Sequence, residues 1–117
     1  MKAKIFEVRV DLYPVLVVFY FGNRPKTIKK YRPEIDVTHL YTGCSTTFYK
    51  EEQTVVCICK ELPITPEAKG FLSHEIFHVS EYILKFVGIK HSESSSEAFS
   101  YLIQHITECV YTKLNIK

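Results

Sequence analysis

The chain has 117 residues, of which 46% are hydrophobic and 24% charged, and its formal net charge is +2. This length suits one domain with its own core, so we expect residues 1–117 to form a single domain, and the composition excludes a disordered chain or a fibrous repeat. The small net charge excludes a strong field that would attract nucleic acid or an anionic membrane to the whole molecule.

The N-terminal segment and the longest apolar run argue against export and membrane insertion. Glu7, Arg9 and Asp11 interrupt the apolar region that a secretory signal requires. The apolar run from Val15 to Phe21 is far shorter than the roughly 20 residues of a membrane-spanning helix. We therefore expect a soluble, cytoplasmic protein without a membrane partner.

The first half of the chain has the patterns of β-strands. Apolar and charged residues alternate from Phe6 to Leu12, which is the period of a strand with one buried face. The β-branched and aromatic run from Val15 to Phe21 predicts a strand covered on both faces. A short helix is expected from Pro25 to Tyr31. Cys44–Tyr49 and Thr54–Cys59, which four polar residues separate, predict a β-hairpin.

The cysteines show no C-x-x-C pair and no disulfide-rich density, which suits a reducing compartment. Cys57 and Cys59 lie two apart in an apolar stretch, so on a strand they share one face. We favour small buried hydrophobic side chains over a metal or redox role for this pair.

The second half of the chain changes to helical periodicity. One apolar stripe consists of Leu72, Ile76, Val79, Ile83 and Val87. Thr65 is placed as the N-cap of this helix, Pro66 at its first position and Gly88 just beyond its end.

A second helix is expected from Ser94 to about Lys113. Its core face carries Phe99, Leu102, Ile103, Ile106 and Val110. Strands followed by two helices predict an α+β domain with a mostly antiparallel N-terminal sheet.

The first of these helices contains the sequence His74-Glu75-Ile76-Phe77-His78, an H-E-x-x-H pattern. Residues four apart lie one turn above each other, so both imidazoles can reach one zinc ion while Glu75 points to the same side as a general base. The alternative is that His74 and His78 are partly buried polar residues without a metal. The position of the pattern inside a well-capped helix favours the metal site.

A catalytic zinc site needs a third protein ligand and an open fourth position. Glu81 stands where the metzincin pattern requires glycine, which excludes that continuation. His91, Glu93 and Glu97 remain as candidates downstream. We favour Glu97, which opens the last helix nineteen positions after His78, although Ser94 and Glu97 could instead form a capping box.

The His74-Glu75-x-x-His78 pattern, followed after eighteen residues by Glu97, resembles the gluzincin group of zinc metallopeptidases. The segment from Ser96 to Leu102 is also similar to the glutamate helix of small zincin-like proteins encoded by phages and mobile elements. The resemblance implies a minimal zincin-like fold with His74, His78 and Glu97 as zinc ligands. It also implies that the strand before the active-site helix, Thr54–Cys59, forms the edge of a peptide-binding cleft.

Gluzincins commonly place an acidic residue one turn after the ligand glutamate to orient a metal-bound histidine, and here that position is Tyr101. Larger members supply a transition-state donor from a C-terminal subdomain, so in this chain we expect a local donor. Tyr101 and His105 share the helix face of Glu97 and are the candidates, with a role in packing as the alternative.

The sequence thus predicts a zinc-dependent metallopeptidase that acts on a peptide or protein substrate. The alternative is a catalytically inactive binding protein that keeps the scaffold. Basic residues concentrated between Arg24 and Arg32 make a nucleic-acid partner conceivable for that alternative, but a solvated surface is the favoured interpretation of the segment.

Overall fold

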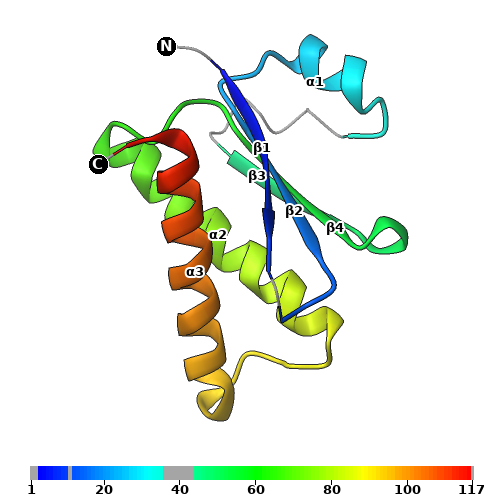
Figure 1. Cartoon of the computed structure of the whole chain (residues 1–117), viewed down its shortest axis with the longest axis vertical. Coiled ribbons are helices and arrows are strands. Elements are labelled where there is room, and N and C mark those ends of the chain that lie inside the picture. Colours follow the sequence, from blue (N-terminus) through cyan, green and yellow to red (C-terminus); the bar gives the residue numbers. More distant parts are fainter. Residues whose placement is uncertain (1–2, 11, 36–43, 117) are drawn as a thin grey trace.

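Figure 1 shows the computed structural model of the chain, which describes residues 3–10, 12–35 and 44–116. Within these ranges a four-stranded sheet and three α-helices form an α+β fold, as the sequence predicts. The elements in chain order are β1 (Lys4–Arg9), β2 (Leu16–Phe21), α1 (Pro25–Tyr31), β3 (Cys44–Tyr49), the 3₁₀ helix η2 (Lys50–Glu52), β4 (Thr54–Cys59), α2 (Pro66–Phe86), the 3₁₀ helix η3 (Glu93–Ser95) and α3 (Ser96–Leu114).

The strands are arranged in the order β1-β2-β4-β3. The pairs β1–β2 and β3–β4 are antiparallel, whereas β2 and β4 are parallel, so the sheet is mostly antiparallel and the predicted hairpin is present. The family resemblance implied that Thr54–Cys59 forms the edge of a peptide-binding cleft, but β4 lies between β2 and β3 and so has no free edge to which a peptide could add. All six residues of β4 are buried, while the more polar β3 tolerates the edge position.

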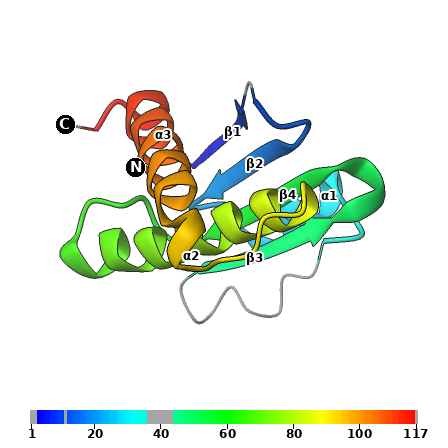
Figure 2. The ribbon, with the colours of Figure 1, turned by 90° about the horizontal axis from the view of Figure 1, so that it is seen from below.

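Helices cover both faces of the sheet. On one face, α3 lies beside β1, and α2 lies along β4 and β3 (Figure 2). Alternate residues of β2 divide between the two sides: Val17 and Phe19 belong to the core under α2 and α3, whereas Val18 and Tyr20 pack with Ile28 of α1. The prediction of a strand covered on both faces is therefore confirmed.

The ends of α2 follow the predicted signals. The Thr65 hydroxyl accepts a hydrogen bond from the Ala68 amide at 3.1 Å, and Pro66 occupies the first helical position. Gly88 follows the helix with a φ of +86°, a conformation that a residue without Cβ adopts at little cost.

Two residues of the predicted apolar faces are exposed. Leu12 is 86% exposed and Val87 is 38% exposed, because each lies beyond the end of its element. The other members of the α2 stripe are buried, and so is the predicted core face of α3 apart from the half-buried Ile103. Within the described residues, no helix combines the length and the apolar character needed to cross a bilayer.

The capping box before α3 is not the one that was the alternative explanation for Glu97. Ser92 and Ser95 exchange side-chain and backbone contacts one turn before the helix, in place of Ser94 and Glu97. The box therefore caps η3, and Glu97 lies in the first turn of α3 without that role. This frees the Glu97 carboxylate for other contacts.

Candidate metal centre

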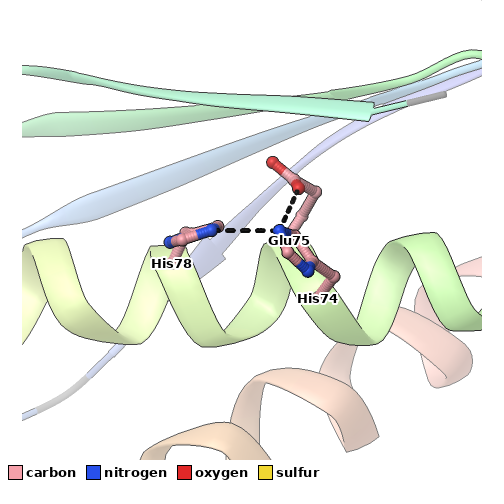
Figure 3. A group of neighbouring side chains, drawn as sticks. All are labelled: His74, Glu75 and His78. Atoms are coloured by element: carbon pink, nitrogen blue, oxygen red, sulfur yellow. Dashed lines mark hydrogen bonds and ion pairs between the residues drawn. The ribbon is translucent and has the colours of Figure 1, made fainter. Parts of the chain in front are cut away.

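His74 and His78 lie one turn apart on α2 and point toward one another (Figure 3). Their Nε2 atoms are 3.1 Å apart. Two nitrogen ligands of a tetrahedral zinc ion, each at 2.0–2.1 Å, lie about 3.3 Å apart, so this spacing fits a single ion. The His74 side chain is 69% exposed, which leaves access from solvent. The two imidazoles form the pair that the H-E-x-x-H spacing predicts.

Glu75 is the one buried charged side chain among the described residues, at 8% exposure. Its Oε1 accepts a hydrogen bond from the Thr46 hydroxyl of β3 at 2.8 Å, and its Oε2 lies 3.8 Å from His74 Nε2. A buried carboxylate is costly without such partners. One oxygen is thus held by the sheet while the other faces the histidines (Figure 3).

Glu81 adds a second carboxylate to the site. Its Oε1 is 2.9 Å from His78 Nδ1, the other ring nitrogen of that histidine. A proton on Nδ1 donates to the carboxylate in this arrangement, which leaves the lone pair of Nε2 directed at the space beside His74. The contact follows the i, i+3 spacing of a helix, so it could have been predicted from the sequence, although the H-E-x-x-H pattern does not include Glu81.

Thr46 was also missed, and no local sequence signal identifies it. Its contact with Glu75 depends on the register that places Thr46 opposite Cys57 and on the packing of α2 beneath β3. Both are properties of the folded sheet. A single-sequence pattern cannot supply either of them.

The structure does not bring Glu97 into the centre. Among the described residues, the ligand atoms that lie within 4.8 Å of one another belong to His74, Glu75 and His78. The chain does return along α2, since Phe77 and Phe99 have ring centroids 5.8 Å apart. Glu97, however, lies two positions before Phe99, about 200° away around α3. Its role as third ligand stays a prediction.

The other two candidates for the third ligand are not in the centre either. The His91 ring packs edge-on against Phe77 and Phe99, with centroid separations of 5.5 and 4.7 Å. Glu93 is exposed in η3. The observed contacts of His91 are those of a packing residue.

Tyr101 and His105 lie elsewhere on the molecule. They line a cavity of about 460 Å³ whose other lining residues are Val10, Leu12, Tyr13, Ala98 and Leu102, none of them from α2. The His105 Nε2 atom is 3.6 Å from the sulfur of Cys109. The structure therefore does not bring the two predicted donors together with the histidine pair, because their face of α3 is turned toward the β1–β2 connection.

The basic segment around α1 is partly neutralised. Arg32 Nη1 lies 2.8 Å from a Glu52 carboxylate oxygen and 3.6 Å from one of Glu34. The Lys29 ammonium donates to the Pro33 carbonyl at 3.0 Å. These contacts favour a solvated surface for this segment.

Comparisons with known proteins do not assign the chain to a family. No protein-family model matches it, and no curated protein or solved structure matches it. The chemistry of the centre is therefore inferred from the side chains themselves.

Proposed function

We propose that the protein is a zinc-dependent metallopeptidase. The observation that carries the proposal is the convergence of two imidazole nitrogens beside a buried carboxylate oxygen on one exposed helix surface. A buried carboxylate next to two potential metal ligands is typical of a functional site.

The donor set fits zinc. Imidazole nitrogens are among the usual ligands of this ion, and the carboxylate of Glu81 fixes His78 in the tautomer that can bind it. In the proposal, His74 and His78 hold the ion with Glu97 as third ligand. When bound, zinc supplies Lewis acidity that polarises a peptide carbonyl and activates water near neutral pH.

Glu75 performs the proton transfers of the proposed reaction. Its Oε2 faces the histidine pair, so it can accept the proton of an attacking water molecule and pass it to the nitrogen of the leaving amine. The Thr46 hydroxyl holds Oε1 and so fixes which oxygen faces the substrate. The products are two shorter peptides.

β3 replaces β4 as the strand beside the proposed cleft. In the described part of the chain β3 pairs with β4 alone, which leaves its other edge available for an extended peptide. Thr46 lies on this strand and contacts Glu75, so a peptide added along β3 would run past the proposed base. The binding mode uses backbone hydrogen bonds and therefore demands little side-chain specificity.

The test combines zinc content with cleavage of a quenched fluorescent peptide library. We expect one zinc per chain, cleavage that a chelator abolishes, and loss of zinc in His78→Gln. Glu75→Gln should retain zinc but lose cleavage by about 10²- to 10⁴-fold. Glu67→Gln, which removes an exposed carboxylate from the first turn of the same helix, is the matched control and should behave as the wild type.

Two outcomes contradict the proposal in different ways. A protein without stoichiometric zinc has no metal centre of the proposed kind. A protein that binds zinc through His78 but cleaves no peptide is not a peptidase. If the Glu75→Gln variant cleaves as well as the wild type, Glu75 is not the base. The zinc-bound, inactive case would favour a binding protein that keeps the metal site.

A further inference from the structure

Three cysteines gather where β3 begins and β4 ends. Cys44 and Cys59 are directly opposite in the antiparallel register, and their sulfur atoms are 2.8 Å apart. Both side chains belong to the core under α2. Cys57, two residues earlier on β4, shares this face and is fully buried, as the sequence predicts. All three are free thiols in the structure.

The paired thiols differ in their surroundings. Cys44 is half-buried at the start of the edge strand, whereas Cys59 is only 1% exposed. Hydrogen bonds with the sulfur atoms of Cys44 and Cys57, together with burial, raise the pKa of the Cys59 thiol well above its usual range. Cys44 is therefore the thiol that an oxidant in solution meets first.

We propose that Cys44 and Cys59 form a reversible disulfide that fastens the start of edge strand β3 to β4. The sulfur atoms need to approach by less than 1 Å to reach the bond length of about 2.05 Å. The inference concerns the sheet and does not depend on the proposed peptidase activity.

Oxidised glutathione represents the chemical class of oxidant, a small disulfide. The Cys44 thiolate attacks one of its sulfur atoms, forms a mixed disulfide and expels one glutathione thiolate. Cys59 then gives its proton to solvent, attacks the Cys44 sulfur and expels the second glutathione thiolate. The two protein thiols lose two electrons and two protons in total, and one oxidised glutathione becomes two reduced molecules.

The strand geometry makes this bond reversible. Directly opposite residues on neighbouring antiparallel strands have Cβ atoms about 4.5–5.5 Å apart, whereas a relaxed disulfide has them about 3.5–4.5 Å apart. A bond formed between opposite positions is strained, and strained disulfides are reduced more easily. This property suits a transient disulfide in a reducing compartment.

The bond has a direct consequence for β3. It closes the chain between Cys44 and Cys59, which contains the whole hairpin, and so limits the unfolded ensemble. We expect oxidation to raise the unfolding midpoint by about 5–10 °C. Thr46 lies two residues after Cys44 on the same face, so the bond also fixes the strand that contacts Glu75.

The experiment treats the reduced full-length protein with oxidised glutathione and maps the products by mass spectrometry. We expect the intact chain to lose two hydrogen atoms, with a linked peptide pair containing Cys44 and Cys59 that dithiothreitol separates. Cys44→Ser should form no such link and show no rise in the unfolding midpoint. Cys109→Ser, which changes a half-buried cysteine outside the cluster, should behave as the wild type.

Each other result overturns the inference. A persistent glutathione adduct on Cys44 shows that Cys59 does not reach it, and a link from Cys44 to Cys57 assigns the wrong partner. An unmodified protein shows that the pair does not react. The mapping uses the wild-type chain, so it is decisive even where a serine variant fails to fold, and Cys44→Ala provides a second variant.

Discussion

The helices beside the two edges of the sheet differ in how their polar side chains are organised. At the β3 edge, His74, Glu75 and His78 of α2 converge, and side chains from β3 and the next helical turn hold two of them in place. At the β1 edge, Tyr101 and His105 of α3 line a cavity whose other side chains are mostly apolar. Both sets were candidates for the same site, but Tyr101 and His105 line a cavity that contains no residue of α2.

The difference shows what sequence spacing determines. The convergence at the β3 edge arises within one helix, where the period of 3.6 residues brings positions four apart onto one face. A shared site between α2 and α3 depends also on how each helix is rotated about its own axis. Phe77 and Phe99 set that rotation by packing between the helices. The following variants test which contacts of the site arise within one helix and which depend on how the two helices pack.

The variant with the largest expected effect, Glu97→Gln, tests whether α3 contributes a zinc ligand to the histidine pair of α2. The Glu97 side chain is exposed and lies outside the histidine pair in the structure, so a role as ligand requires α3 to move toward a bound ion. We expect Glu97→Gln to weaken zinc binding by more than the roughly 10–100-fold typical of losing a group that only supports a ligand. Titration with a competing chelator measures the affinity.

His91→Gln and Glu93→Gln are the matched controls, because they change the other two candidates and should leave zinc affinity unchanged. Wild-type affinity in Glu97→Gln would show that α3 supplies no ligand through this residue. A large loss in His91→Gln would assign the third ligand to the loop before α3.

The next effect tests the support given to His78. Removal of the carboxylate in Glu81→Ala leaves His78 Nδ1 without the partner that fixes its tautomer. We expect zinc affinity to fall by about 10–100-fold. Glu67→Ala removes a carboxylate from the first turn of the same helix and should leave the zinc affinity unchanged. Equal affinities in the two variants would show that the contact between Glu81 and His78 does not orient a ligand.

A smaller effect is expected from the contact across the β3 edge. Thr46→Val removes the hydroxyl that donates to Glu75 and leaves a buried carboxylate oxygen without its partner. A hydrogen bond to a charged group contributes about 1.5–3 kcal/mol, so we expect cleavage to fall about tenfold and the free energy of unfolding to fall by about 1–3 kcal/mol.

Zinc affinity should not change in Thr46→Val, because the histidines keep their contacts. Thr46→Ser should restore cleavage, and Thr47→Val, at the exposed neighbouring position, should have no effect. A loss of zinc in Thr46→Val, or a failure of serine to restore cleavage, would show that Thr46 supports the fold of the edge and not the position of Glu75.

Local sequence patterns predicted the helices and strands well, because these patterns depend directly on which side chains are buried and where the chain turns. α1 and both strands of the β3–β4 hairpin have the predicted bounds, and Thr65 caps α2 as expected. Strand order was less accessible. The pattern of Thr54–Cys59 indicated burial, but a run of apolar residues does not say which strands lie on either side.

The candidate site divides in the same way. The mutual position of His74 and His78 follows from one helix, and the contact of His78 with Glu81 could have been read from the same helix. The contact of Thr46 with Glu75 required the register of two strands and the placement of a helix. Several serines precede α3, so the sequence allowed more than one capping box, and the structure has the one formed by Ser92 and Ser95.

The smallest expected effect is at the β1 edge. Tyr101→Phe and His105→Gln remove the polar groups of the two predicted donors, and both variants should cleave peptides at the wild-type rate because their cavity contains no residue of α2. Tyr101 is 70% exposed, so its hydroxyl contributes little to stability. A tenfold fall in kcat with unchanged zinc content would mean that α3 turns this face to the centre when substrate binds. The separation of Tyr101 and His105 from the histidine pair would then hold only for the protein without substrate.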